Sequence, residues 1–103
     1  MKNSLNKKNI GIFILAHKRL NLLKRTLFAL NKFLNKKDLI HIFFDTYSNK
    51  SNKKTISEIK KVEKFLRNLN KNKYHIVYRN KNFGMTKNWF DAYSYMYSKY
   101  KKV

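Results

Sequence analysis

Polar side chains that could bind a ligand follow three apolar runs of the sequence. Residues 16–19 follow the first run, Asp45 ends the second, and residues 79–87 follow the third. If the runs are parallel strands, all three segments lie at the carboxyl edge of one sheet, where open α/β sheets bind ligands. Basic groups on two segments and a carboxylate on the middle one suit a phosphorylated ligand whose base or sugar donates a hydrogen bond to Asp45.

Several common kinds of site are disfavoured by what the sequence lacks. The chain has no cysteine, which excludes disulfides, thiolate zinc sites and a cysteine nucleophile. Neither of the glycine-rich phosphate-binding motifs occurs, so dinucleotide oxidoreductases and P-loop NTPases are poor interpretations. His41 and His75 fall within apparent strands and are interpreted as structural, whereas His17 at a strand exit suits a structural or a ligand-binding role. We predict no catalytic residue and no metal ligand in this chain, because no carboxylate pair or metal-ligand spacing occurs.

Hydrophobic periodicity predicts the elements that position these segments. Continuous apolar runs predict strands buried on both faces of a parallel sheet, at 10–16, 39–44 and 74–78. Between and after the strands, apolar residues recur at helical spacing. Thr55 and Glu58 have the spacing of a capping box at the start of the second helix, and Thr86 is the expected N-cap of the third.

The order β-α-β-α-β-α predicts one α/β domain with three αβα layers and a parallel sheet. With 103 residues the chain is long enough for a single small domain. Residues 1–9 are expected to be a basic disordered start and residues 10–103 the domain. Residues 101–103 would begin a fourth strand.

The charge of +20 arises from 21 lysines and 4 arginines against 5 acidic residues. The sequence also has 14 asparagines and no proline, a bias that an A/T-rich genome produces without selection for binding. Attraction to a polyanion or to an anionic membrane remains open as the alternative explanation. The apolar run at 10–16 is too short to cross a bilayer and lacks a signal-peptide cleavage site. A cytoplasmic location is therefore expected, with peripheral contact at the inner face of the membrane left open.

Three stretches resemble, in the correct order, motifs of bacterial GT-A glycosyltransferases of the family 2-like type. The run I-F-I-L-A-H-K-R-L-N-L-L-K-R-T-L-F-A-L at 12–30 resembles the family's opening strand and helix, with Leu20 where proline is usual. I-F-F-D at 42–45 is similar to the second strand, and R-N-K-N-F-G-M-T-K-N-W at 79–89 to the exit of the third. The resemblance implies the N-terminal half of a GT-A Rossmann-like nucleotide-sugar-binding domain.

The resemblance also implies a nucleotide pocket. The first loop would line it, the aspartate after the second strand would accept a hydrogen bond from the base, and the third loop would shape the wall near the ribose and diphosphate. The residues concerned are Ala16, His17 and Arg19 of the first loop, Asp45, and Asn82, Gly84 and Lys87 of the third loop. Structural interpretations stay open for Asp45 as a loop cap, Gly84 as a turn residue and Lys87 as a solvated lysine.

In the resembled family, an acidic Asp-x-Asp-type motif follows the fourth strand, which here would begin near Val103. That motif holds a divalent ion such as Mg²⁺ or Mn²⁺ on the phosphates of the donor. The resemblance thus implies a nucleotide-sugar-binding portion of a glycosyltransferase, which moves a sugar from a nucleotide-diphospho-sugar donor to a glycan or other acceptor. A chain without the motif would hold no cofactor and would be inactive alone. Turnover of a nucleotide sugar by the 103-residue chain would contradict this expectation.

A different class of function also remains open, namely a small basic α/β protein that binds nucleic acid or a membrane surface. Trp89 near Lys87 is one of several aromatic residues beside lysines, as in single-strand binding surfaces. Nucleic acid is the less favoured partner, because the charges are spread along the chain and no common nucleic-acid-binding module has this order of elements.

Overall fold

Strands and helices alternate along the chain in the computed structural model, which describes residues 8–34 and 38–102 and the side chains of 11–34 and 38–100. The strands are β2 (Lys8–Ile10), β3 (Ile12–Ala16), β4 (Ile40–Phe44), β5 (Tyr74–Tyr78) and β6 (Tyr100–Lys102), and the helices are α1 (Leu20–Phe33), α2 (Lys53–Arg67) and α3 (Met85–Lys99). The predicted α/β class, and the alternation of strands and helices, are confirmed.

The main sheet is parallel and has the order β3-β4-β5. All five residues of β4 are buried, as its apolar run, interrupted only by His41, predicts for a central strand covered on both faces. A second parallel ladder joins β2 to β6, and only Gly11 separates β2 from β3. Strands β2 and β3 therefore follow one another in nearly one line. Strands β4 and β5 lie on one side of that line, and β6 lies on the other.

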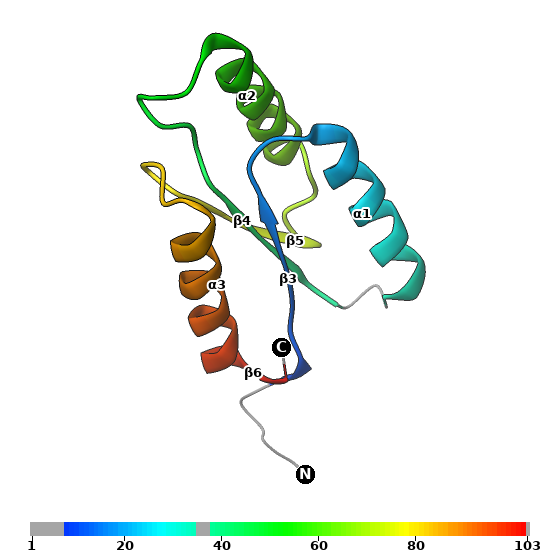
Figure 1. The fold of residues 1–103 in the computed structure, drawn as a ribbon. Coiled ribbons are helices and arrows are strands. Elements are labelled where there is room, and N and C mark those ends of the chain that lie inside the picture. Colours follow the sequence, from blue (N-terminus) through cyan, green and yellow to red (C-terminus); the bar gives the residue numbers. More distant parts are fainter. Residues whose placement is uncertain (1–7, 35–37, 103) are drawn as a thin grey trace.

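Helices cover both faces of the sheet, α1 and α2 on one side and α3 on the other (Figure 1). Alternate residues of β4 enter the two cores. Ile40, Ile42 and Phe44 pack with the apolar stripes of α1 and α2, whereas Phe43 packs with Ala92 of α3. This arrangement gives the three αβα layers, with the carboxyl ends of β3, β4 and β5 at one edge.

Two helices begin earlier than predicted. Helix α2 starts at Lys53, and its N-cap is Asn52, whose side-chain oxygen accepts from the Thr55 backbone N–H at 2.8 Å. Thr55 thus lies inside the first turn, so the predicted capping box does not mark the start of the helix. Helix α3 starts at Met85 with Gly84 as N-cap in place of Thr86. In both helices, a residue that precedes the predicted cap in the sequence occupies the N-cap position.

The amino-terminal end of the domain differs from the prediction, whereas the predicted fourth strand is present. Lys8 and Asn9 belong to β2, although residues 1–9 were expected to be a disordered start; residues 1–7 lie outside the described residues. The expected fourth strand is present as β6 and begins at Tyr100. Val103 lies outside the described residues. Among the helices that the structure describes, none is both long and apolar enough to cross a bilayer.

Gly11 is required by close packing at the junction of the two ladders. A methyl group built on it would collide with the ring of Tyr100 and come within 2.9 Å of the Met96 Cε atom. We expect Gly11→Ala to lower the free energy of unfolding by about 1–3 kcal/mol, the usual cost of overpacking a core. Chemical denaturation measures it, with Tyr100→Ala as the background. If Gly11→Ala costs as much without the Tyr100 ring as with it, the packing explanation is wrong.

Candidate functional site

The three polar segments lie together at the carboxyl edge of the sheet. Beyond the end of β4, the backbone N–H of Asp45 donates to the carbonyl of Ala16 at 2.8 Å. On the other side, the N–H of Arg79 donates to the carbonyl of Phe44 at 3.0 Å. These bonds continue the strand ladders by one residue, so the exits of β3, β4 and β5 are held side by side.

The carboxylate of Asp45 fixes the loop that leads into α3. Its Oδ1 atom accepts from the backbone N–H of Phe83 at 2.8 Å, and its Oδ2 atom accepts from the N–H of Gly84 at 3.0 Å. The Asn82 side-chain amide donates to the same Oδ2 atom at 3.3 Å and to the Thr46 carbonyl at 2.8 Å. We call this set of bonds from residues 82–84 to Asp45 the Asp45 clamp.

The clamp gives Asp45 a structural role, and its predicted contact with a nucleotide base stays a prediction. Only 4% of the residue is exposed, and both carboxylate oxygens accept from the protein. In this conformation the group orders a loop, and its burial restricts the access of a ligand to the carboxylate. Asp45 is therefore a positioning residue for the neighbouring polar groups. Asp45 caps a loop, as its structural interpretation predicts, but the capped loop is the one after β5 and not the one that directly follows Asp45.

His17 is oriented by the same strand exit. Its Nδ1 atom lies 2.8 Å from the backbone carbonyl of Asp45, which can only accept. The bond therefore requires a proton on Nδ1, and in the neutral ring Nε2 is left as an acceptor. The side chain is partly exposed, so this nitrogen could accept from a ligand hydroxyl at the carboxyl edge.

Asn88, which lies outside the predicted polar segments, and Arg79, which begins the third of them, pack next to the clamped loop. Asn88 of α3 is 3% exposed; its amide donates to the Phe43 carbonyl at 3.2 Å, and its Oδ1 accepts from Arg79 Nε at 2.9 Å. The Arg79 guanidinium lies over the Phe83 ring, 4.7 Å from its centroid. Asn88 lies four positions before Ala92, on the apolar stripe of the third helix. A polar residue at such a position was the signal in the sequence that could have indicated a buried, hydrogen-bonded side chain.

The clamped loop forms one wall of a polar hollow of about 470 Å³ beside the ends of β4 and β5. Its lining residues are Thr46, Tyr47, Ser48, Asn49, Asn80, Lys81 and Asn82. Ligand pockets have volumes of about 300–1,000 Å³, so the hollow is large enough for part of a small polar ligand. Of the predicted site residues only Asn82 lines it.

The remaining predicted residues surround the start of α3 or stand apart. Gly84 has φ 83°, a left-handed region that favours glycine, and a methyl group there would meet open space. Lys87 is exposed in the first turn of α3, with its Nζ atom 4.6 Å from the centroid of the Phe83 ring. Arg19 is exposed before α1 with φ 68°. The structure thus brings His17, Asp45, Asn82 and Gly84 into one bonded group with the Ala16 backbone, and leaves Arg19 and Lys87 at its margin.

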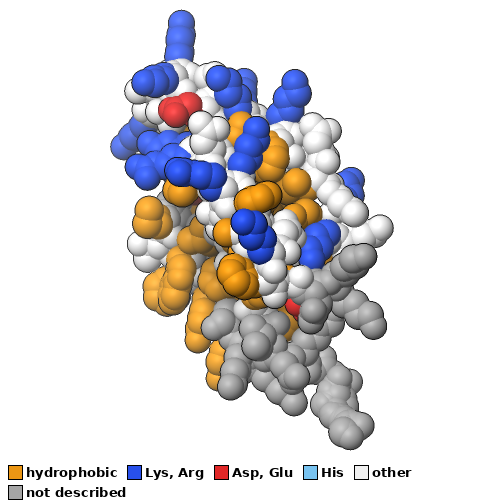
Figure 2. Space-filling model, turned by 90° about the vertical axis from the view of Figure 1, so that its right-hand side faces the viewer, with side chains coloured by type: hydrophobic (Ala, Val, Ile, Leu, Met, Phe, Trp, Pro, Cys, Tyr) orange, Lys and Arg blue, Asp and Glu red, His pale blue; other side chains and the backbone are white. Residues whose placement is uncertain are grey.

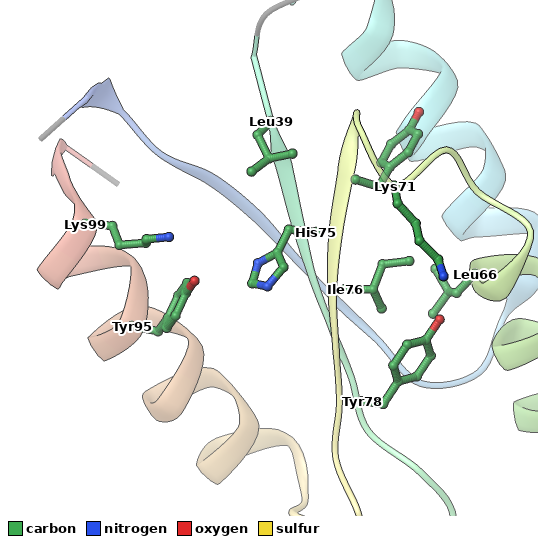
Figure 3. A pocket seen from close by; sticks show the side chains of 9 residues that line it. Leu39, Leu66, Lys71, His75, Ile76, Tyr78, Tyr95 and Lys99 are labelled. Atoms are coloured by element: carbon green, nitrogen blue, oxygen red, sulfur yellow. The ribbon is translucent and has the colours of Figure 1, made fainter.

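A second group of polar residues lies under α3, away from this edge. His41 is fully buried; its Nε2 atom lies 2.6 Å from the Tyr100 hydroxyl, and its Nδ1 atom lies 2.9 Å from Nδ1 of His75. His75 lines another hollow of about 450 Å³ along the outer edge of β5, together with Tyr95 and Lys99 of α3 (Figure 3). The bonds among His41, His75 and Tyr100 tie β4, β5 and β6 together, which fits the structural interpretation of His41 and His75.

Stability should depend on pH through His75. Burial, and then the nearby charge of Lys99, lower the pKa of His75 below its ordinary value of 6.5. The unfolded chain therefore takes up a proton before the folded protein does, and the free energy of unfolding falls as the pH drops below about 6.5. Denaturation at several pH values measures the slope. His75→Gln should flatten it, and an unchanged slope in that variant would contradict this origin.

Across 8–34 and 38–102, no group of three or more His, Asp or Glu side chains is placed to hold a metal ion. The divalent ion that the family resemblance implies therefore has no ligand set among the described side chains.

The chain matched no protein-family model, no curated protein and no solved structure.

Proposed function

We propose that the protein binds a nucleoside diphosphate group, as the nucleotide-sugar-binding portion of a GT-A-type glycosyltransferase. The observation that carries this proposal is the Asp45 clamp, which holds the 82–84 loop against the polar hollow at the carboxyl edge. A buried carboxylate that accepts two backbone N–H bonds orders a loop before any ligand arrives, which lowers the entropic cost of binding.

The sheet order supports a ligand at this edge. Strands β4 and β5 lie on one side of β3. Strand β6 pairs with β2, which precedes β3 in the same line, and lies on the other side. In open α/β sheets, ligands bind outside the carboxyl ends of the strands where the order reverses in this way. His17 and the start of α3 flank that point, because His17 follows β3 and Gly84 is joined to Asp45.

The side chains around the edge suit the parts of such a ligand. Lys81 in the hollow and Lys87 in the first turn of α3 supply positive charge for phosphates, and the helix N-terminus adds unpaired backbone N–H groups. Asn80 and Asn82 can bond to ribose hydroxyls, and Tyr47 offers an exposed ring for stacking a base. The glycosyltransferase part of the proposal, with its sugar donor and glycan acceptor, rests on the three motifs at 12–30, 42–45 and 79–89.

Equilibrium titration with nucleoside diphosphates, one base at a time, tests this proposal. We expect saturable binding that Lys81→Ala weakens about five-fold, equivalent to about 1 kcal/mol for one surface charge. Lys64→Ala, which removes an exposed lysine of α2 outside the hollow, should leave the affinity unchanged. Equal effects of the two variants would mean that net charge, not the hollow, attracts the ligand.

Nucleic acid is the alternative that one observation favours. Trp89 stacks on Tyr93 with ring centroids 5.2 Å apart, and both rings are exposed on α3. Stacked exposed aromatic rings on a protein with a charge of +20 could bind single strands. Such binding would weaken steeply between low and physiological salt. We expect nucleoside diphosphate binding to depend much less on salt, and a stronger, salt-sensitive affinity for single-stranded RNA or DNA would favour the alternative.

A further inference from the structure

The hollow along the outer edge of β5 has the composition of a site for an organic anion. Lys71 and Lys99 line it, and none of the described side chains that line it is acidic. Leu66 and Ile76 add apolar surface, and three tyrosines border it. Its volume of about 450 Å³ falls within the range of ligand pockets, and it shares no residue with the hollow at the carboxyl edge.

The end of this hollow next to α3 is polar. The Lys99 Nζ atom lies 5.2 Å from the centroid of the Tyr95 ring, and that centroid lies 5.8 Å from the centroid of the His75 ring. Figure 3 shows the His75 ring pointing toward Tyr95 and Lys99. Burial, and then the charge of Lys99, lower the pKa of His75, which also indicates that the two groups are close. An ammonium group and an imidazole ring therefore meet at this end.

The Nε2 atom of His75 is accessible to a ligand. The other ring nitrogen, Nδ1, bonds to His41. Within the described part of the chain, Arg79 holds the one buried side-chain nitrogen or oxygen that has no hydrogen-bond partner. No described residue bonds to Nε2 of His75, so this atom is not buried, and a ligand would reach it from the hollow that His75 lines.

The tautomer of His75 is linked to that of His41. Their Nδ1 atoms are 2.9 Å apart, so in the neutral pair one of them donates and the other accepts. If His41 donates, the proton of His75 is on Nε2, and Nε2 of His41 accepts from the Tyr100 hydroxyl at 2.6 Å. If His75 donates, its own Nε2 is an acceptor, and Nε2 of His41 donates to that hydroxyl. A group bound at Nε2 of His75 decides between these two arrangements.

An anion in the hollow selects the first arrangement. A carboxylate can only accept hydrogen bonds, so it requires the proton of His75 on Nε2. Its two oxygens suit the two donors at this end, the imidazole N–H and the ammonium group of Lys99. The apolar part of the same ligand would lie against Leu66 and Ile76, while Lys71 adds positive charge that disfavours a cationic ligand.

We propose that this hollow binds a small amphipathic carboxylate, an apolar ring system with one carboxylate group, and that His75 and Lys99 are its hydrogen-bond donors. Binding fixes one direction of hydrogen-bond donation, from Tyr100 to His41, from His41 to His75, and from His75 to the ligand. The hollow at the carboxyl edge has a separate set of lining residues, so this site is independent of the proposed nucleotide site.

The net charge of the protein is another reason for an anion to bind. The charge is +20, and Lys and Arg side chains far outnumber Asp and Glu on the face shown in Figure 2. Such a surface attracts anions of every kind, most strongly at low salt. The position of the proton on His75, and a lysine outside the hollow, separate the two explanations.

Naphthalene-2-carboxylate is the probe, and its neutral amide, naphthalene-2-carboxamide, is the comparison. At physiological salt and about pH 8, where the lowered pKa of His75 keeps the ring neutral, we expect saturable binding of the carboxylate. The amide should bind at least about tenfold more weakly, because it lacks the charge. Lys99→Gln should weaken binding of the carboxylate about fivefold. Lys64→Gln, which changes an exposed lysine of α2 outside this hollow, should leave it unchanged.

Nitrogen NMR of the histidine side chains locates the proton directly. In the protein saturated with the carboxylate, we expect the proton of His75 on Nε2 and the proton of His41 on Nδ1. A proton on Nδ1 of His75 in that complex overturns the proposal, as does the absence of saturable binding. Equal affinities for the carboxylate and the amide, or equal effects of Lys64→Gln and Lys99→Gln, also overturn it.

Discussion

Asp45→Ala is expected to lower the free energy of unfolding by about 2–4 kcal/mol and to release the 82–84 loop. The substitution leaves the N–H groups of Phe83 and Gly84 without their acceptor, and each unpaired buried group costs about 1–3 kcal/mol. Water reaches the loop once it opens, which recovers part of that cost. Denaturation gives the stability change, and amide exchange at Phe83 and Gly84 reports on the loop itself.

Two other substitutions sharpen this test. Asp45→Asn keeps the shape but has only one acceptor oxygen, so its effect should fall between those of the wild type and Asp45→Ala. Asp91→Ala removes an exposed carboxylate of α3 and serves as the control for charge, with an expected change within about 0.5 kcal/mol. If Asp45→Ala and Asp91→Ala have the same small effect, the clamp does not order the loop.

His41→Leu is the second substitution with a large expected effect. It should lower the free energy of unfolding by about 2–3 kcal/mol, although leucine fills a similar volume, because the buried Tyr100 hydroxyl loses its 2.6 Å partner. The link between β4 and β6 is lost with it. Thermal or chemical denaturation measures the change.

A double-mutant cycle separates this hydrogen bond from packing. In a Tyr100→Phe background no hydroxyl remains to be left unpaired, so His41→Leu should cost at least 1 kcal/mol less there, on the order of one buried hydrogen bond. Equal costs in the two backgrounds would show that His41 stabilises the fold only by filling space.

The sequence was sufficient to predict the strands and the edge where polar residues gather. The apolar runs at 39–44 and 74–78 are interrupted only by His41 and His75, and short runs of this kind favour parallel strands; β4 is buried throughout as predicted, whereas β5 lies at the edge of the sheet and is only half-buried. Once the strands are parallel, the segments after them must share an edge, which is why Asp45 and Asn82 meet. The helix starts were less predictable, because Asn52 and Thr55 are both good capping residues and lie only three positions apart.

The roles of individual side chains could not be predicted, because they depend on contacts distant in sequence. Asp45 bonds to Phe83, 38 residues away, and His41 bonds to Tyr100, 59 residues away. A carboxylate at a strand exit is compatible with binding a base and with ordering a loop, and only the distant backbone N–H groups that reach it reveal the second role. Asn88 was missed for a similar reason, since its partners lie on β4 and after β5.

The most direct test of a nucleotide site at the carboxyl edge uses the two glycines of the chain. Gly84 belongs to the clamped loop, and Gly11 lies at the opposite end of β3 against Tyr100, so their amide NMR signals form an internal comparison. On titration with a nucleoside diphosphate, we expect the Gly84 signal to shift saturably while the Gly11 signal stays in place. An unmoved Gly84 signal, or equal shifts of both signals, would contradict a nucleotide site at this edge.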